Sequence, residues 1–314
     1  MKLGIALANF SWDVPVSQLG AKITGIARQA DDAGVDSLWV MDHLFQIRMS
    51  GLAPESPMPE AYATLGVLAG QTRNIRLGTL VTSVAYRHPG VLLKTVTTLD
   101  VLSGGRMYLG VGVGAPFNPE PLGPGTRFEG EGLGIPFPPL GDRFEMLAEL
   151  LQIARAMWDG DETPFAGKHY RLVRPLNSPN SVQRPWPPIL VAGGGERRTL
   201  PLVARYADAC HLPDLPPQEQ LSSRLSGDLR DKFAILREQC AAVGRDYADI
   251  EKSVGARLDF GDAGLDALRK RLHELADLGV DHAMVVPSGP WTADAIDALA
   301  AILPEVHAIT PAGR

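Results

Sequence analysis

Short apolar runs bounded by turn-forming residues recur along the chain, and several of the segments between them have helical periodicity. The runs are apolar at successive positions, which is typical of parallel strands that helices cover on both faces. Eight such runs predict strands at residues 3–8, 37–41, 75–82, 106–112, 189–192, 209–212, 252–256 and 282–286. Eight strands alternating with helices predict an α/β fold, the (β/α)8 TIM barrel.

Amphipathic helices fill several of the gaps between these runs. Residues 16–33 and residues 142–158 repeat apolar side chains three or four positions apart, beginning at Leu19 and Phe144. A further helix is predicted at residues 196–204, close behind a strand. Strand and helix therefore follow each other in the order that a barrel requires.

Two segments lack periodicity and are rich in glycine and proline, residues 114–141 and residues 159–187. Long loops without regular structure in a compact domain are usually functional or disordered. The first of them follows a predicted strand directly, so it is expected to lie over the C-terminal mouth of the barrel. Barrel enzymes have their active sites at that mouth, and we therefore predict loop insertions there.

The composition narrows the class of protein. Of the 314 residues, 45% are hydrophobic and 21% are charged, as in ordinary globular enzymes. Single barrels span about 200 to more than 400 residues, so one domain over residues 1–314 is expected. A net charge of −6 and the lack of an apolar run near the ~20 residues of a membrane span disfavour nucleic acid and membrane partners. Cys210 and Cys240 suggest reduced thiols in a cytoplasmic protein.

An acid and an imidazole, Asp42 and His43, end the apolar run at residues 37–41. The carboxyl ends of parallel barrel strands meet at one face, so both side chains are expected at the mouth. The alternative is that they are only the polar end of a strand that has reached the surface.

Three glycines, Gly110, Gly112 and Gly114, occupy alternate positions at the end of the fourth predicted strand. A Rossmann dinucleotide turn would need a helix to begin at once, but Pro116 and further prolines follow instead. We expect these glycines to let the backbone pass close to a flat ligand. Simple packing inside the barrel is the alternative interpretation.

Another glycine run, Gly193, Gly194 and Gly195, separates a predicted strand from the helix predicted at residues 196–204. Bare N–H groups at the start of a helix attract phosphate, and no side chain obstructs them here. Glu196 would repel a phosphate if it pointed inward, although an acid in the first turn suits the helix dipole. A phosphate site is the prediction, and a purely structural turn is the alternative.

Several other chemistries lack their residues. No His-x-His marks the first strand, no lysine ends a predicted strand, and no Ser-His-Asp arrangement can be inferred from the spacing. A metal-dependent hydrolase, a Schiff-base aldolase and a serine hydrolase are therefore disfavoured, and no metal ligands are predicted. Ser83, Arg87 and His88 follow the third strand and are able to hold a ligand or an acid, or are an ordinary polar strand end.

Taken together and in order, these motifs resemble the bacterial luciferase-like family, and within it the branch that uses the deazaflavin coenzyme F420. The motifs lie at residues 41–43, 81–89, 98–106, 109–114, 137–144, 192–195 and 204–208. Several motifs in the correct order are more specific than any single one. The resemblance implies a barrel that binds its flavin-like cofactor at the C-terminal mouth.

The resemblance also implies roles for individual residues. Asp42 would contact the deazaflavin, and His43 would lie near the reacting carbon as the catalytic group. Ser83 and Val84 would form a bulge under the ring, joined by a non-proline cis peptide bond. The cofactor would be flanked by Gly112, Val113, Gly114 and Asn118, and Gly194 and Gly195 would offer backbone N–H groups to its phosphate. Gly193 and Glu196 are expected in the same cofactor site.

Three hypotheses about function remain open from the sequence. The first is an F420-dependent oxidoreductase that moves a hydride between the deazaflavin and a small organic substrate, with His43 handling the proton. The second is an FMN-dependent monooxygenase of the same superfamily, and the third is a flavin-binding barrel without catalysis. Sugar-phosphate oxidation is not expected, since Ala115 stands where related sugar-phosphate dehydrogenases carry a glutamate. A homodimer is expected.

Overall fold

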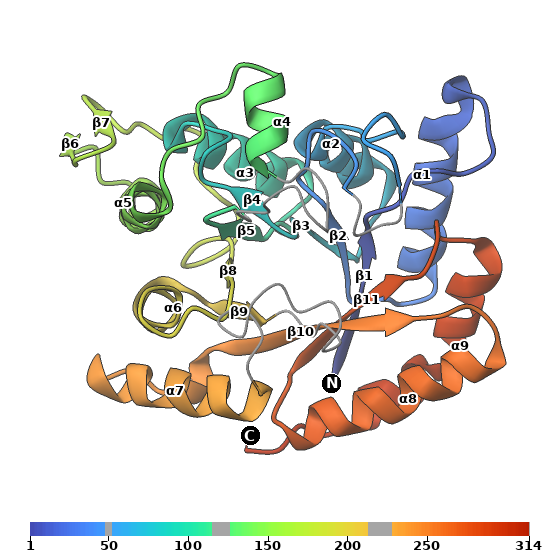
Figure 1. Ribbon diagram of the computed structural model, residues 1–314. Helices are drawn as coiled ribbons and strands as arrows, with labels where there is room; N and C mark the ends of the chain where they lie inside the picture. Colours follow the sequence, from blue (N-terminus) through green and yellow to red (C-terminus); the bar gives the residue numbers. More distant parts are fainter. Residues whose placement is uncertain (48–51, 115–125, 213–227, 314) are drawn as a thin grey trace.

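The computed structural model describes residues 1–47, 52–114, 126–212 and 228–313, and its helices surround a ring of strands (Figure 1). The strands of the main sheet are β1 (Lys2–Leu7), β2 (Ser37–Val40), β3 (Arg76–Thr79), β4 (Thr82–Ser83), β5 (Leu109–Gly112), β8 (Ile189–Ala192), β9 (Ala209–Leu212), β10 (Glu251–Leu258) and β11 (His282–Pro287). Their order is β3-β2-β1-β11-β10-β9-β8-β5-β4, and every pair is parallel. The predicted TIM-barrel fold is confirmed.

The helices and the small outer elements complete the described chain. The helices are α1 (Val16–Asp32), α2 (Ala61–Gln71), α3 (Pro89–Leu102), α4 (Thr126–Gly132), α5 (Leu140–Asp159), α6 (Thr199–Tyr206), α7 (Leu229–Ala242), α8 (Asp262–Asp277) and α9 (Ala293–Ala308), with a 3-10 helix, η3 (Tyr247–Asp249). A short antiparallel hairpin joins β6 (Phe165–Ala166) to β7 (Arg171–Leu172). None of the helices in the described ranges is both long and apolar enough to span a bilayer.

The third strand of the barrel is divided in two. β3 pairs with β2, β4 pairs with β5, and a bridge between Leu77 and Met107 brings β3 against the start of the fourth strand. A non-proline cis peptide bond joins Leu80 to Val81 between the two halves. The prediction of a cis bond at Ser83–Val84 is therefore wrong, because the cis bond lies between β3 and β4, where the chain passes from pairing with β2 to pairing with β5.

Most predicted elements are found with small shifts. The strands predicted at residues 189–192 and 209–212 match β8 and β9, and the helix predicted at 16–33 is α1. The helix predicted at 196–204 begins later, at Thr199, because the N–H groups of Thr199 and Leu200 both bond to the carbonyl of Gly195. The two segments predicted to lack regular structure contain α4 and the hairpin of β6 and β7, so that prediction is wrong in part.

The inside of the barrel is filled by side chains from four strands and from Tyr108, the residue directly before β5. The buried cluster there consists of Trp39, Tyr108, Leu190, Ala209 and Met284. The rings of Trp39 and Tyr108 lie 5.2 Å apart, and the indole Nε1 of Trp39 donates to Ser37 Oγ. A larger apolar core lies between the strands and the surrounding helices, so the barrel is packed on both faces, as a parallel sheet requires.

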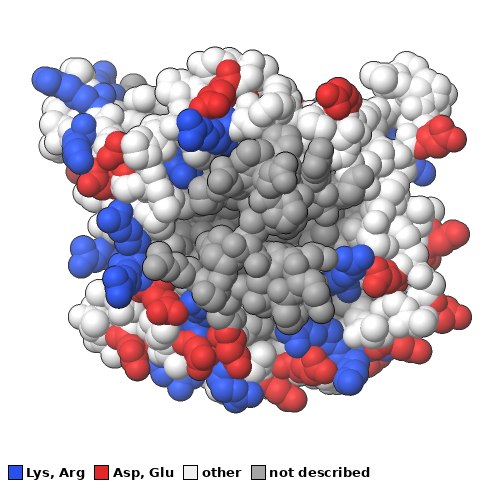
Figure 2. Space-filling model, viewed as in Figure 1, with Lys and Arg blue, Asp and Glu red and all other residues white. Residues whose placement is uncertain are grey.

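Charged side chains of both signs are interspersed around the rim of the face seen in Figure 2. Several lysine and arginine side chains lie together along the left edge of this face, with acidic side chains above and below them (Figure 2). A polyanion would therefore meet repulsion as well as attraction there.

Gly78 supplies the first testable prediction, because it makes room for the ring of Trp39. A Cβ atom at Gly78 would lie 2.6 Å from Trp39 Cζ3 and 3.1 Å from Tyr108 Cβ. Gly78→Ala should therefore lower the free energy of unfolding by about 1–3 kcal/mol, the usual effect of overpacking, as measured by urea unfolding. The control is Gly70→Ala on α2, where a Cβ meets nothing within 4 Å. Equal stabilities of the two variants would contradict the packing argument.

Candidate active site at the mouth of the barrel

Four adjacent strand ends carry the residues that the sequence singled out. β2 pairs with β3, which continues as β4, β4 pairs with β5, and β5 pairs with β8. The ends of these strands lead into Asp42 and His43, Ser83 and Val84, Gly112 to Gly114, and Gly193 to Glu196 respectively. The structure therefore brings the described members of the predicted site to one side of the C-terminal mouth. Asn118 and Ala115 lie outside the described residues.

The layer of the lumen above Trp39 is lined by side chains of different sizes. Met41, Ala192, His211 and Val286 lie two residues beyond members of the buried cluster, so they face the same interior, and all four are partly exposed. Gly255 pairs with Met284 in the sheet, and a Cβ atom added to it would meet nothing within 4 Å. Ala192 and Gly255 are the small residues of this layer.

Asp42 is buried beneath the mouth and is bound by an arginine. Its two carboxylate oxygens accept from Arg87 Nη1 at 2.7 Å and Nη2 at 3.1 Å, and its exposed fraction is 2%. Arg87 also pairs with Glu60 and lies over the ring of Tyr62. Burial raises the pKa of Asp42, while Arg87 and Thr82 act to lower it. The ion pair ties the end of β2 to the segment that precedes α3, and the predicted contact of Asp42 with a cofactor stays a prediction.

His43 is held by a carboxylate that the sequence did not reveal. Its Nδ1 lies 2.5 Å from Oε1 of Glu129, on α4. The other oxygen, Oε2, accepts from the N–H of Leu44 at 2.6 Å and from the hydroxyl of Tyr86 at 3.1 Å. Glu129 is only 1% exposed, so a buried carboxylate and an imidazole face each other at the mouth.

An arginine binds the segment that follows the fourth barrel strand, β5. Nη1 of Arg143 donates to the carbonyls of Val113 and Gly114, the latter at 2.6 Å. Gly114 has φ 74°, a backbone conformation that favours glycine. At the neighbouring strand end, the N–H of Val84 donates to the carbonyl of Gly112 at 3.0 Å, and Ser83 and Val84 are both buried. Ser83 and Val84 are therefore held against β5, and a bulge at these residues stays a prediction.

In the glycine turn after β8, two backbone N–H groups donate no hydrogen bond to the part of the chain that the structure describes. The N–H of Gly193 donates to the carbonyl of His211, whereas no described hydrogen bond uses the N–H of Gly194 or Gly195. A Cβ atom at Gly195 would lie 2.7 Å from Thr199 Oγ1, which explains the glycine there. The carboxylate of Glu196 accepts from Lys232 Nζ on α7 at 2.7 Å. Its charge is therefore paired with a cation, and the pKa of Glu196 is lowered by that contact.

His211, on β9, is a further polar group at the mouth that the sequence analysis did not name. Its Nδ1 lies 3.1 Å from Ser253 Oγ, and that hydroxyl donates to the carbonyl of Cys210 at 2.8 Å. Nδ1 must therefore carry a proton, which leaves Nε2 as an acceptor. Burial and the nearby His282 lower the pKa of His211 to about 3, so the ring is neutral at neutral pH. The available signal was a lone histidine in an apolar run.

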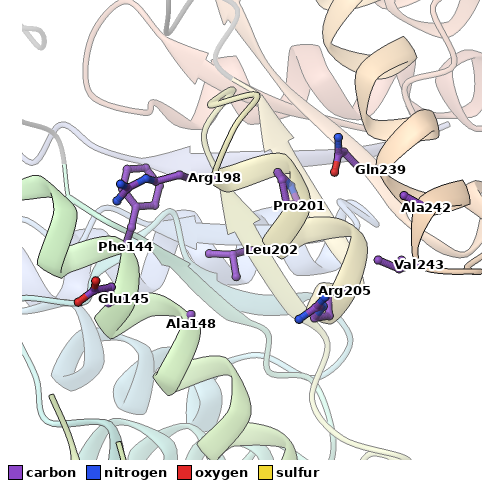
Figure 3. Close-up of a pocket in the computed structure, with 10 residues that line it drawn as sticks. All are labelled: Phe144, Glu145, Ala148, Arg198, Pro201, Leu202, Arg205, Gln239, Ala242 and Val243. Carbon is purple, nitrogen blue, oxygen red and sulfur yellow. The ribbon is translucent and has the colours of Figure 1, made fainter. Parts of the chain in front are cut away.

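The described residues offer two further features outside the mouth. Asp142, Glu145 and His169 have ligand atoms within 4.8 Å of one another, but Lys168 Nζ already lies 2.7 Å from Glu145 and supplies a positive charge. A groove of about 590 Å³ runs between α5, α6 and α7, with Arg198 and Arg205 among its lining residues (Figure 3). No predicted site residue lines that groove.

Comparison with known proteins places the chain in a family. The sequence model of the luciferase-like monooxygenase family matches residues 1–295. The chain belongs to this family. Its F420 branch was the resemblance drawn from the sequence motifs, and four of these motifs, at residues 41–43, 81–89, 109–114 and 192–195, lie at or follow strand ends at the mouth.

Relatives of this luciferase-like chain include two F420-dependent glucose-6-phosphate dehydrogenases. That of Nocardia farcinica is 34% identical over 187 residues, covering 59% of this chain and 50% of that protein. That of Kineococcus radiotolerans is 29% identical over 253 residues, covering 79% of this chain and 66% of that protein. The chain thus spans about half to two thirds of the length of these curated relatives.

Two solved structures of similar fold carry different chemistries. The monooxygenase RslO1 from Streptomyces bottropensis has a TM-score of 0.77 at 19% identity and covers 98% of this chain and 100% of its own. An F420-dependent secondary alcohol dehydrogenase, solved in complex with an F420-acetone adduct, has a TM-score of 0.77 at 18% identity and covers 97% and 98%. At these identities the likeness shows the fold of the luciferase-like chain.

The buried pair of Asp42 and Arg87 gives a prediction about stability and pH. Arg87→Met removes the cation and leaves a buried carboxylate, which should cost about 3–5 kcal/mol of unfolding free energy at pH 7.5. Burial raises the pKa of Asp42 in the folded protein above the ordinary pKa of an aspartate. Ionisation of Asp42 therefore lowers the free energy of unfolding as the pH rises above that ordinary pKa. Without Arg87 that pKa rises further, and the loss should be smaller at pH 5 than at pH 7.5.

Denaturant unfolding at the two pH values measures this difference. The control is Arg174→Met, whose partner Glu162 and whose own side chain are both largely exposed, with an expected change below about 1 kcal/mol. A loss in Arg87→Met that is the same at both pH values would show that the charge of Asp42 is not its cause.

Proposed function

We propose that this luciferase-like protein is an F420-dependent oxidoreductase that transfers a hydride between the deazaflavin and a small organic alcohol or carbonyl compound. The observation that carries the proposal is the imidazole of His43, which a buried carboxylate holds at the C-terminal mouth of the barrel. The names of the curated relatives support the choice of cofactor.

The residues at the mouth fit such a cofactor in three respects. The upper lumen presents Ala192 and the bare backbone of Gly255 where a tricyclic ring would lie. The N–H groups of Gly194 and Gly195 have no described partner and suit a phosphate. Lys232 neutralises Glu196, which removes the repulsion that the sequence analysis foresaw. Asp42, Ser83, Val84, Gly112, Val113 and Gly114 remain the proposed flank of the ring.

The chain's own residues would then divide the work. When bound, the deazaflavin would supply or accept the hydride. The packed side chains in the lumen beneath it would exclude water from below. His43 would give a proton to the substrate oxygen or take one from it. His211 is neutral and offers an acceptor nitrogen to the same space. One domain, a homodimer and a cytoplasmic location remain our proposals.

An FMN-dependent monooxygenase is the second candidate, because RslO1 and the F420-dependent alcohol dehydrogenase match the fold with the same TM-score. Titration of the purified protein with F420 and with FMN, followed by fluorescence, separates the two. We expect F420 to bind with a Kd at least about tenfold lower than that of FMN, a difference of about 1.4 kcal/mol. Binding of FMN without measurable binding of F420 would favour the monooxygenase.

Replacement of His43 tests the proposed chemistry. Asn is able to donate to Glu129 as Nδ1 does, but it has no basic nitrogen with which to exchange a proton. His43→Asn should therefore lower turnover of a productive alcohol by about 100-fold or more, while the Kd of F420 changes less than about threefold. Single-turnover kinetics at saturating F420 measure the rate.

The control for this variant is His273→Asn. His273 is an exposed histidine on the outer helix α8, so this variant should have the same turnover rate as the parent. A rate for His43→Asn within threefold of the parent would mean that the proton comes from another group. If both candidate cofactors bind but no alcohol, enone or imine is turned over, the catalytically idle barrel becomes the better description.

A further inference from the structure

We propose that Glu129 is a positioning residue that fixes the tautomer of His43, so that Nε2 is the nitrogen that exchanges a proton with the substrate. This inference rests on the function proposed above and adds the residue that makes His43 competent. It assigns that role to a short helix, α4, in a segment that the sequence analysis expected to lack regular structure.

The orientation of the Glu129 carboxylate is determined by two donors. The N–H of Leu44 and the hydroxyl of Tyr86 both bond to Oε2, and the N–H of Phe45 lies 3.4 Å from the same atom. Oε1 is thereby directed at Nδ1 of His43, 2.5 Å away. A backbone N–H cannot rotate away or be titrated, so the bond from Leu44 holds the carboxylate in one orientation.

The proton on His43 follows from this orientation. An ionised carboxylate only accepts, so Nδ1 of a neutral His43 must carry the hydrogen. Nε2 then holds the lone pair. No hydrogen bond to Nε2 is found among the described residues, and the side chain is partly exposed at the mouth. The base therefore faces the space in which the substrate is proposed to bind.

The proton transfer balances in the direction of alcohol oxidation. The O–H bond of the alcohol breaks and its proton passes to Nε2, which makes His43 a cation paired with Glu129. The C–H bond would break with its electron pair as the C=O bond forms, and the oxidised deazaflavin, if held at the proposed site, would supply the acceptor for that hydride. Carbonyl reduction is the reverse, with the proton returned from Nε2. The negative charge of Glu129 stabilises the cationic ring in either direction.

The isosteric variant Glu129→Gln makes a sharp test. The N–H of Leu44 still needs an acceptor, so the amide oxygen of the substituted side chain must take the place of Oε2. The amide NH2 group then faces Nδ1 of His43 and donates to it. Nδ1 becomes the acceptor, the proton moves to Nε2, and the nitrogen that faces the substrate loses its lone pair. A side chain of the same size and shape thus inverts the tautomer.

The tautomer is measured by 15N NMR of histidine-labelled protein at pH 8.5, with the signals of His43 assigned by their loss in His43→Asn. We expect the Nδ1–H pattern in the parent and the Nε2–H pattern in Glu129→Gln. Turnover should fall by about 100-fold or more, with the Kd of F420 within about threefold. Glu129→Asp keeps a carboxylate and should keep the Nδ1–H pattern and turn over at least about tenfold faster than Glu129→Gln.

The matched control is Glu131→Gln on the same helix, whose carboxylate is exposed and pairs only with Arg127 among the described residues. It should leave both the tautomer and the turnover unchanged. An unchanged Nδ1–H pattern in Glu129→Gln, turnover within threefold of the parent, or loss of F420 binding together with turnover would each overturn the proposal. The NMR comparison needs no cofactor, so the inference about the tautomer is tested even if F420 proves to be the wrong cofactor.

Discussion

A barrel of eight strands, with β3 and β4 counted as the two halves of one, has room inside for side chains and little else. This constraint decides where a ligand site is able to form. Trp39 and Tyr108 fill the middle of the lumen, and Gly78 stands beside them because no side chain would fit there. Among the described residues, Ala192 and Gly255 lie in the layer above these two rings, and a Cβ atom added to Gly255 would meet nothing within 4 Å. The packed rings close the lumen below that layer, so the proposed cofactor would have to lie on the side of the C-terminal mouth.

The three histidines of the lumen and its mouth differ in what their nitrogens contact. Both nitrogens of His282 are occupied, by Ser37 Oγ at 2.8 Å and by Glu251 Oε1 at 3.0 Å. Although burial raises the pKa of Glu251, the contacts with His282 and Lys2 prevail and lower it, so this cluster is a structural brace. His43 has one nitrogen bound to a carboxylate, and only that arrangement leaves a basic nitrogen supported by a negative charge.

The sequence alone predicts the barrel because each strand is an apolar run with its own turn signals. It places the polar strand ends at one face for the same reason, since parallel strands all finish there. Asp42 and His43 could therefore be found without a structure. What they bind could not, because the partner of Asp42 lies 45 residues along the chain and that of His43 lies 86 residues along it.

Glu129 escaped the sequence analysis for physical reasons. Its helix reads Thr-Arg-Phe-Glu-Gly-Glu-Gly, with two glycines that weaken helical propensity and with no apolar periodicity. The stability of such a helix comes from tertiary contacts, here the bonds from Leu44 and Tyr86 to the carboxylate. The weak helical signal of α4 kept Glu129 from being found in the sequence. The same weakness means that the helix depends on the contacts of its buried carboxylate.

The position of the acid in the chain is less constrained than its position in space. Ala115 stands where the resemblance places a glutamate directly after the strand, while Glu129 comes fourteen residues later and reaches His43 from above. Barrel loops change without disturbing the strands, so an acid supplied by a loop helix leaves the packed lumen intact. A site built in this way keeps the imidazole and its carboxylate in contact without any change to the strands of the barrel.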